Sequence, residues 1–449
     1  MAKLALMGGP KAVTLDRLKF KRPAVSEEAI AAVVALMRKG ETSVSPAINA
    51  FERNFAQYIG TEHALAVSSG TAALHTGLYA AGIGPGDEVI VASYTYPSTA
   101  GLITTVGGTA IFCESDLDTH NLDPADIARK ITPRTRGIMV CHLWGNPCDM
   151  GPILELARPR GITVIEDCSH AHGAVWHGTK VGAVGDIGCF SCQGSKLIGA
   201  GEGGIVTTSS RTLYERSILL GRVENRAEFR EDPFCPPYSF TGVGIKYRPH
   251  PLGIAIAHDH LRHLDELNEI RDRQGAILEA ALADIPAIVP QRVLPGCRRV
   301  YAYQFMRYDP SRLGGVSSDT FLRALAAEGI GAGRTGYGRL HGQALFTHGF
   351  PYSPGRTTYG VLGVALPDYA NGPLPVTEDL RDNVFYGAPR FEMDCRELID
   401  QYVDGYHKVA AAVDELLAYD RQQAAKQQAA PTDGLSVHLL DAPARRAGG

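Results

Sequence analysis

The sequence lacks a long apolar run. No apolar stretch in its 449 residues approaches the roughly 20 residues of a membrane-spanning helix, and the opening MAKLALMGGPKAV lacks the apolar core of a secretory signal peptide. It also lacks an excess of one charge: 44 Lys and Arg stand against 48 Asp and Glu, for a formal net charge of -4. This balance gives no broad attraction to nucleic acid or anionic lipid. We therefore expect a cytoplasmic protein that binds neither.

The cysteines lack the spacing of a disulfide framework. There are nine, an odd number, and they are scattered singly, which is typical of free thiols in a reducing compartment. Cys189 and Cys192 form a C-x-x-C pair, but no second pair accompanies it. We expect these two side chains to pack in the interior and we expect no metal site.

What is present is a regular alternation of short apolar runs and helical patterns. Apolar runs at 64–67, 88–92, 110–112, 137–141, 162–165, 187–190 and 204–208 are separated by helical segments. This alternation predicts an α/β fold with a mainly parallel sheet flanked by helices. A long helical run from Leu252 toward Arg273 is expected to link it to a smaller α+β domain with a strand at 300–308 and helices at 319–328, 378–386 and 396–417.

The composition and length allow more than one domain. The chain is 45% apolar and 20% charged, which is ordinary for a soluble protein of this size. We expect an N-terminal arm (1–23), a large domain (24–265), a small C-terminal domain (266–420) and a flexible tail (421–449). The tail assignment depends on its polar, Ala- and Gln-rich composition.

The chemistry concentrates between Val164 and Gly204. One apolar run leads into the acidic pair Glu166-Asp167, another leads into Ser191, and Lys196 then stands before a glycine-rich segment. A carboxylate at a strand end, followed about thirty residues later by an isolated lysine, suits pyridoxal phosphate (PLP), because the lysine forms the Schiff base and the acid keeps the pyridine nitrogen protonated. Taken alone, the lysine is more often a surface residue in a glycine loop, whereas the whole segment favours the cofactor.

A second segment has the features of a phosphate site. Ser69-Gly70-Thr71 stands between a short strand and a small-residue helix at 72–81. Backbone N–H groups at a helix start are unpaired and the helix dipole favours an anion there, although the same residues would also make a plain helix cap. Tyr96, after the strand at 88–92, could stack on a flat cofactor ring or could be a core tyrosine.

Together these motifs resemble the DegT/DnrJ/EryC1/StrS family of PLP-dependent aminotransferases over most of residues 25–415. The motifs that carry the resemblance are SSGTAAL (68–74), SYTYPST (93–99), HLWGNPCDM (142–150), EDCSHAHGA (166–174), VGDIGCFSCQGSK (184–196), GEGG (201–204) and KYRPHPLGIAIA (246–257). The resemblance implies an aspartate-aminotransferase-like fold (fold type I) with a seven-stranded sheet. It also implies amino transfer from L-glutamate or L-glutamine to a ketone on a sugar or cyclitol, in the biosynthesis of an aminosugar, an aminocyclitol or a related specialised metabolite.

The resemblance assigns roles position by position. Lys196 resembles the Schiff-base lysine and Asp167 the carboxylate that pairs with the pyridine nitrogen. Some family members carry histidine in place of the lysine and act as dehydratases, so Lys196 favours the aminotransferase branch. The remaining cofactor contacts that the resemblance implies are Gly70, Thr71 and Ser191 at the phosphate and Tyr96 on the ring.

Two positions depart from the family pattern. His170 stands where glutamine is frequent, near the cofactor's phenolic oxygen, and its imidazole could donate there or be an ordinary core histidine. Lys246 stands where many members have asparagine in an N-Y-R motif that reaches the phosphate in the neighbouring subunit. A lysine there could contact the phosphate as a point charge. That role implies a homodimer with shared active sites.

The substrate side is less determined. The candidates are polar loop residues near predicted site elements, each of which alone is more often an ordinary loop residue: Arg222, His250, Arg334, Tyr337 and His341. The opening LALMGGPKAV resembles the start of cyclitol aminotransferases that use glutamine. The sequence leaves open whether the acceptor is nucleotide-linked, a free cyclitol or another natural-product carbonyl. It also leaves open a PLP-binding regulatory protein without turnover.

Overall fold

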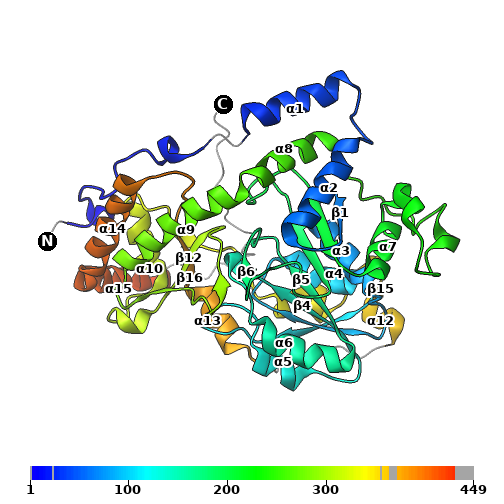
Figure 1. The fold of residues 1–449 in the computed structure, drawn as a ribbon. Helices are drawn as coiled ribbons and strands as arrows, with labels where there is room; N and C mark the ends of the chain where they lie inside the picture. Colours follow the sequence, from blue (N-terminus) through cyan, green and yellow to red (C-terminus); the bar gives the residue numbers. More distant parts are fainter. Residues whose placement is uncertain (1–2, 23–24, 354–355, 364–371, 430–449) are drawn as a thin grey trace.

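The computed structural model describes residues 3–22, 25–353, 356–363 and 372–429. Within them lie two main sheets, each accompanied by helices (Figure 1). No helix in these ranges is both long and apolar enough to cross a bilayer. Most of the tail that the sequence predicts as flexible, residues 430–449, lies outside the described residues.

The larger sheet has seven strands in the order β1-β9-β8-β5-β4-β2-β3. β2 pairs in parallel with β3 and β4, β4 with β5, and β5 with β8, whereas β9 runs antiparallel to β1 and β8. The strands are β1 (His63–Val67), β2 (Glu88–Ala92), β3 (Thr109–Cys113), β4 (Thr135–Cys141), β5 (Thr163–Asp167), β8 (Ile187–Ser191) and β9 (Gly204–Thr208). The predicted mainly parallel, seven-stranded sheet is confirmed.

Helices cover both faces of this sheet, because successive residues of a strand point to opposite sides. Val89 and Val91 pack beneath α3, α4 and α7, whereas Ile90 packs on the other face against α5 and α6. The rest of that other face is covered by α2 and α8, and α1 packs on α8. The helices are α1 (Glu27–Arg38), α2 (Pro46–Ile59), α3 (Gly70–Ala80), α4 (Pro97–Thr105), α5 (Pro124–Lys130), α6 (Met150–Ala157), α7 (Arg211–Leu219) and α8 (Pro251–Arg262).

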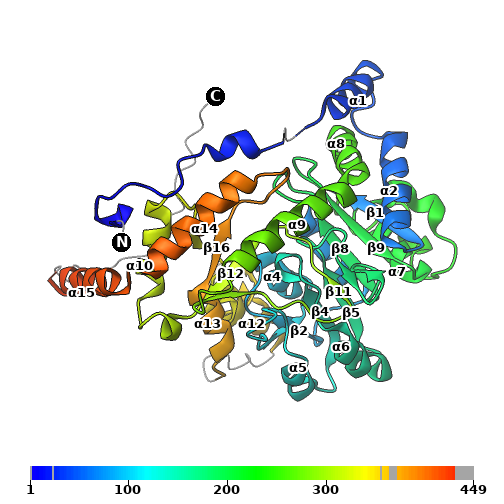
Figure 2. The same ribbon diagram turned by 60° about the vertical axis from the view of Figure 1, so that its left-hand side comes forward.

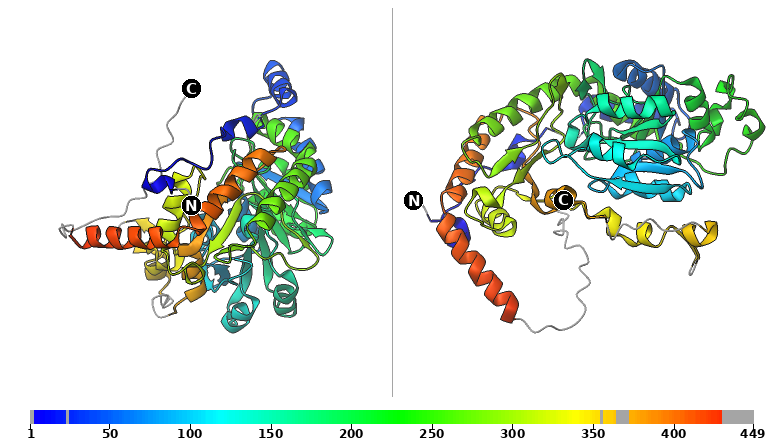
Figure 3. Two further views of the ribbon diagram at one scale, coloured as in Figure 1. Left: turned by 90° about the vertical axis from the view of Figure 1, so that its left-hand side faces the viewer. Right: turned by 90° about the horizontal axis from the view of Figure 1, so that it is seen from below.

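The second sheet is antiparallel and has the order β10-β12-β16-β13. Its core cluster joins Met306 and Phe385 to apolar side chains of α9, α10, α14 and α15. α9 and α14 run side by side (Figure 2), and α15 projects from the edge of the molecule (Figure 3). The elements are α9 (Leu264–Ala281), β10 (Ile288–Pro290), β12 (Gln304–Tyr308), α10 (Ser318–Ala327), β13 (Gly333–Arg334), α13 (Pro375–Asn383), β16 (Val384–Ala388), α14 (Arg396–Ala410) and α15 (Val413–Ala429).

Smaller elements complete the described chain. β6, β7 and β11 form a three-stranded sheet and β14 and β15 form a two-stranded sheet. Their bounds, with those of two short helices, are β6 (Val175–Trp176), β7 (Thr179–Lys180), β11 (Cys297–Arg298), α11 (Ala344–Thr347), β14 (Pro351–Ser353), β15 (Arg356–Thr357) and α12 (Thr358–Leu362).

The structure corrects three element predictions. The helical run from Leu252 is two helices, because the backbone leaves the helical region at His263 (φ -103°, ψ 3°). The helix expected to Tyr386 ends at Asn383, and the aromatic residues that follow form β16 because they pair with β12. The helix expected at 396–417 is also two helices, α14 and α15.

α15 continues to Ala429, so the beginning of the predicted tail is helical. Alanine and glutamine are strong helix formers, and the polar composition of this segment is therefore compatible with a surface helix. The domain limits themselves stay a prediction.

Candidate active site

A cavity of about 520 Å³ opens at the carboxyl ends of the central strands. Cys141 ends β4, Asp167 ends β5 and Ser191 ends β8, while Gly70 begins α3 beside them. The carboxyl edge of a parallel sheet is where ligands bind in open α/β folds. The residues that line the cavity are Ser69, Gly70, Thr71, Leu74, Tyr96, Cys141, Trp144, Asp167, Ser169, His170, Ser191, Gln193, Ser195, Lys196, Glu202, Tyr303, Phe305, Thr335 and Tyr337.

Asp167 is a buried carboxylate held by two neutral donors. The Thr99 hydroxyl donates to Oδ2 at 2.7 Å, and the backbone N–H of Ser169 donates to Oδ1 at 3.1 Å. The residue is 2% exposed, and within the described ranges no ion pair involves it. A buried carboxylate is costly without a cation. The site therefore suits a ligand that brings a positively charged N–H.

Lys196 stands on a closed loop between β8 and β9. Backbone hydrogen bonds join Cys192 to Gly203 and Gly194 to Gly201, and the Lys196 N–H donates to the carbonyl of Gln193 at 2.8 Å. The side chain is half-buried in the cavity wall, and no other described residue makes a hydrogen bond or an ion pair with its Nζ. The amine is thus presented to the cavity and is open to reaction.

The start of α3 forms a close cradle against the end of β8. Ser69 caps the helix through its Oγ, which accepts from the Ala72 N–H at 3.0 Å. A Cβ at Gly70 would lie 2.5 Å from the Cβ of Ser191, so only glycine fits at this position. Gly70, Thr71 and Ser191 all line the cavity where the helix dipole and unpaired N–H groups attract an anion.

His170 belongs to an aromatic stack beside this cradle. Its ring lies 5.1 Å from that of Trp144 at 12°, and Trp144 in turn lies 5.0 Å from Tyr337 at 21°. Nδ1 of His170 accepts from the Trp144 backbone N–H at 3.4 Å, which leaves the proton on Nε2. Burial, followed by the charges of Lys196 and His172, holds the pKa of His170 well below its usual value. The ring is therefore a neutral Nε2–H donor.

The backbone around Trp144 is unusual. Trp144 has φ 60° and ψ 13°, a left-handed conformation that bulky residues rarely adopt. At the next residue, a Cβ on Gly145 would meet the Val300 carbonyl oxygen at 1.9 Å. Strained positions of this kind cluster at functional sites, and here the strain turns the indole into the cavity wall.

The other member of the acidic pair, Glu166, has a separate role. It accepts from the N–H groups of Gly182, Val184 and Gly185 and pairs with Nε2 of His142 at 2.9 Å. Cys168 also lies close, so the three side chains have the spacing of a metal site. However, Nδ1 of His142 accepts from the Cys148 N–H, so Nε2 carries the proton and the imidazole offers no free lone pair.

The lining residues fit PLP. Asp167 would hold the pyridine N–H, Gly70, Thr71 and Ser191 would hold the phosphate, and Lys196 would reach the aldehyde carbon. Tyr96 would cover the ring. The fit depends on three features together. The Asp167 carboxylate has no ion pair among the described residues, the Lys196 amine has no hydrogen-bond partner there, and Gly70 approaches Ser191 closely.

The remaining predicted residues lie in different places. Tyr337 lines the cavity, whereas Arg222, His250, Arg334, His341 and Lys246 are not among its lining residues. His250 caps α8 through Nδ1, and Lys246 is exposed. His341 contacts Ser93 at 2.7 Å, and Arg334 pairs with Asp319 at 2.7 Å.

Arg222 has the most distinct environment of these. It is 2% exposed and pairs with Glu52 at 3.0 Å and Glu224 at 2.9 Å, and it also donates to the Ala66 carbonyl. A second cavity of about 460 Å³ opens beside Glu52 and Glu224, between α2 and α7, but it holds none of the predicted cofactor contacts.

Several residues of the site were not predicted from the sequence, among them Thr99, which holds Asp167, and the lining residue Trp144. Thr99 stands in SYTYPST and Trp144 in HLWGNPCDM, so their motifs were visible but their partners were not. Phe305 lies on β12 of the second sheet and Tyr303 lies just before that strand, where only a strand pattern was visible in the sequence. Glu202 also lines the cavity, from the glycine-rich segment after Lys196.

The fold and the site define an enzyme of fold type I, the architecture of aspartate aminotransferase. The chain belongs to the DegT/DnrJ/EryC1/StrS aminotransferase family, whose model matches residues 23–360. The expected family and fold are confirmed, and the protein is an aminotransferase.

Two relatives and one solved structure illustrate the likeness. GDP-perosamine synthase of Caulobacter vibrioides is 43% identical over 245 residues, which are 54% of this chain and 63% of that relative, so the match spans less than two thirds of it. A protein of Streptoalloteichus tenebrarius named "Putative L-glutamine:3-amino-2,3-dideoxy-scyllo-inosose aminotransferase" is 35% identical over 306 residues, 66% of this chain and 71% of that relative. An aminotransferase from Psychrobacter cryohalolentis has a TM-score of 0.77 at 25% identity, over 88% of this chain and 100% of that chain.

Proposed function

We propose that this protein is a PLP-dependent aminotransferase that moves an amino group from L-glutamate or L-glutamine to a ketone on a sugar or cyclitol. The observation that carries the proposal is that Lys196, Asp167 and the start of α3, with Gly70 and Thr71, all line the same cavity. The names of the relatives, which include a perosamine synthase and an inosose aminotransferase, support a polyhydroxylated ring as the acceptor. We place the reaction in the cytoplasm, where the nine free cysteines would stay reduced.

Each residue at the reacting centre has a defined task. Bound PLP supplies an electron sink for the bond broken at the donor's α-carbon. Asp167, oriented by Thr99 and Ser169, keeps the pyridine nitrogen protonated through a charge interaction across a buried contact. Lys196, whose Nζ has no hydrogen-bond partner among the described residues, would take the α-proton of the donor and pass it to the cofactor carbon that carried the aldehyde, and would make the same transfer in reverse when the ketone is aminated.

His170 completes the cofactor contacts. As a neutral ring with its proton on Nε2, it would donate to the phenolic oxygen of PLP. Because its pKa is held well below its usual value, the ring stays neutral, so that Nδ1 can accept from the Trp144 N–H while Nε2 donates.

We further propose a homodimer in which Lys246 reaches the partner's phosphate site. Lys246 is exposed and follows three exposed apolar side chains in sequence, Phe240 at 89%, Val243 at 38% and Ile245 at 37%. Such exposure is costly in a monomer, and burial against a second copy would offset it. Sedimentation of the protein at micromolar concentration tests this assignment, and a monomer with full activity would contradict it.

The function is tested in two steps. The purified protein is loaded with PLP, and its visible absorbance is followed as glutamate or glutamine is added without acceptor. Loss of the visible band, with formation of the corresponding 2-oxoacid, is the expected result, and an unchanged band with every donor would contradict the proposal. The aminated form is then offered nucleotide-linked ketosugars and free inososes, and recovery of the band identifies the acceptor.

A further inference from the structure

α13 (Pro375–Asn383) begins without a cap from its own segment. Its N-cap residue, Leu374, has an apolar side chain that makes no capping hydrogen bond, and the first residue is a proline. The next two N–H groups, of Val376 and Thr377, would remain unpaired at a helix start in the absence of an acceptor.

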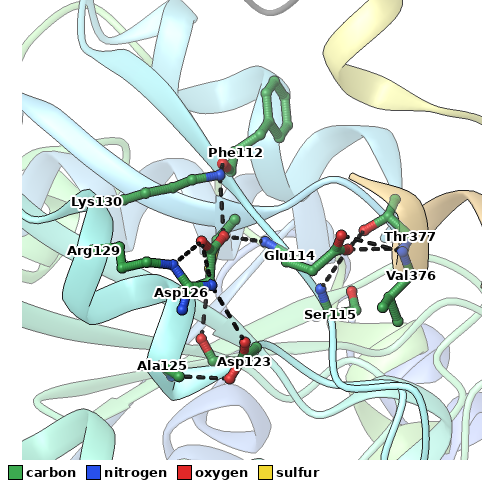
Figure 4. Close-up of polar contacts among 11 residues, drawn as sticks. Phe112, Glu114, Ser115, Asp123, Ala125, Asp126, Arg129, Lys130, Val376 and Thr377 are labelled. Carbon is green, nitrogen blue, oxygen red and sulfur yellow. Dashed lines mark hydrogen bonds and ion pairs between the residues drawn. The ribbon is translucent and has the colours of Figure 1, made fainter. Parts of the chain in front are cut away.

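Glu114 supplies that acceptor from a distant part of the chain (Figure 4). It follows β3, and its carboxylate accepts from the Val376 N–H at 3.2 Å, the Thr377 N–H at 2.8 Å and the Thr377 hydroxyl at 2.7 Å. Its own backbone is fixed in turn, because the Glu114 N–H donates to Asp126 at 2.7 Å. A carboxylate at the positive end of a helix gains both from these hydrogen bonds and from the helix dipole.

The inner face of α13 supports the aromatic part of the cavity wall. Val376 and Leu380 pack in one apolar cluster with Trp144, Phe305 and Tyr337. All three aromatic residues line the cavity. A shift of α13 would therefore move their packing partners, although neither Glu114 nor α13 contributes a lining residue.

A second contact ties α13 to the segment that follows Tyr337. Glu378 pairs with Arg339 at 3.0 Å and lies 3.7 Å from Nε2 of His341. His341 is anchored to Ser93, just after β2, at 2.7 Å. The segment around Tyr337 is thus held between α13 and the larger sheet.

We propose that Glu114 is a positioning residue for the acceptor: by capping α13 from the larger sheet, it sets the aromatic wall against which a ring-shaped substrate packs. The inference rests on the proposed function, because it concerns the acceptor of that same reaction. A saturated ring presents a flat C–H face to aromatic side chains, whereas the acyclic amino donor has no such face. Lys196 and Asp167 lie on elements of the larger sheet, so the proton transfers do not depend on this cap.

The principal test is Glu114→Gln in the PLP-loaded protein. The amide keeps one acceptor but places an NH2 group against the helix N–H groups. The acceptor KM is expected to rise roughly tenfold, the equivalent of about 1.4 kcal/mol, which is typical of a lost cap. The rate of the donor half-reaction at saturating glutamate or glutamine is expected to stay the same. An unchanged acceptor KM, or equal slowing of both half-reactions, would overturn the proposal.

A second measurement, the quenching of Trp144 fluorescence, reports directly on the packing of the aromatic wall of the cavity. The chain has two tryptophans, so Trp176→Phe leaves Trp144 as the single tryptophan, which is excited selectively above the absorption of tyrosine. In that background, Glu114→Gln should increase the quenching of Trp144 by acrylamide at equal cofactor loading. If Glu114→Gln does not fold, Thr377→Val removes only the hydroxyl donor and should change KM and quenching in the same direction by a smaller factor.

Asp123→Ala is the matched control. Asp123 caps α5 close to Glu114, with Oδ1 accepting from the Ala125 N–H at 2.9 Å, and its side chain makes no contact with α13 (Figure 4). An equal rise in acceptor KM in this variant would assign the effect to general loosening and reject the positioning role. A wild-type protein without any donor half-reaction would instead reject the proposed function.

Discussion

The hydroxyl of Thr99 donates a 2.7 Å hydrogen bond to the carboxylate of Asp167. Thr99 belongs to α4 and Asp167 ends β5, so the bond joins a helix start to the carboxyl edge of the sheet. Both residues are buried, and the Thr95 hydroxyl in turn donates to Thr99 at 3.3 Å. The orientation of the proposed pyridine partner is therefore set by a short chain of hydroxyl groups.

Replacing Thr99 by valine should weaken this orientation while keeping the shape of the side chain. The donor half-reaction is expected to slow by roughly tenfold, or about 1.4 kcal/mol, since a hydrogen bond to a charged group is lost. Stopped-flow absorbance measures the rate. Thr95→Val is the comparison, because its hydroxyl donates to Thr99 and not to Asp167, so a smaller slowing is expected. Equal slowing in both variants would contradict a specific role for the direct Thr99 contact.

Lys196→Ala should fold and bind PLP through the α3 cradle but lose turnover, because no other side chain in the described cavity offers a free amine. The variant should also lose the cofactor label that borohydride fixes to the Lys196 peptide in the wild type. Circular dichroism checks the fold. Unaltered turnover in Lys196→Ala would remove the lysine assignment.

His120 should make the fold sensitive to acid. Burial, with smaller contributions from Arg299 and Arg307, lowers its pKa to about 3. The unfolded chain therefore binds a proton near pH 6.5 that the folded chain does not, and stability falls as the pH drops below that value. At pH 5 the contribution of His120 to this loss is about 2 kcal/mol relative to pH 8, and His172, whose pKa burial also lowers to about 3, adds to it.

Urea unfolding at pH 8 and pH 5 measures that difference. His120→Asn suits the left-handed backbone at this position (φ 60°) and should reduce the loss at pH 5. The same loss in the variant and the wild type would show that His120 does not carry this proton linkage.

Arg222→Met should destabilise the fold rather than impair substrate binding. The change leaves Glu52 buried without its partner, which costs about 3 to 5 kcal/mol. Adding Glu52→Gln removes the stranded charge while keeping an acceptor for the Ala66 N–H, so the double variant should recover part of the stability. A selective rise in KM with unchanged urea midpoint would instead support the substrate role considered for Arg222.

The strands of the larger sheet were predictable because each is a short apolar run ended by small or polar residues. The prediction was weakest where an aromatic segment could form either a helix or a strand. Phe385 and Tyr386 satisfy a helical pattern, but they pair with β12. The break at His263 is equally hidden, since nothing in its residue type interrupts the helical periodicity on either side.

The site was predictable to the extent that its residues stand in compact motifs. Asp167 and Ser191 each end a strand and Lys196 comes five residues after Ser191, so their place at the sheet edge follows from the strand pattern. Glu114 and Thr377 are 263 residues apart, and no local pattern announces their contact. The burial of Arg222 is likewise a tertiary property, because its partner Glu52 lies 170 residues away.

The cavity draws its walls from two sheets. Asp167, Ser191 and Lys196 come from the larger sheet and its loops, whereas Phe305 lies on β12 of the second sheet, Tyr303 just before that strand and Tyr337 shortly after β13. Under the proposed function, substitutions of Phe305 are therefore expected to change which carbonyl is accepted more than they change the groups that hold the cofactor. One inherited chemistry can in this way be redirected to new substrates by changes confined to a single wall.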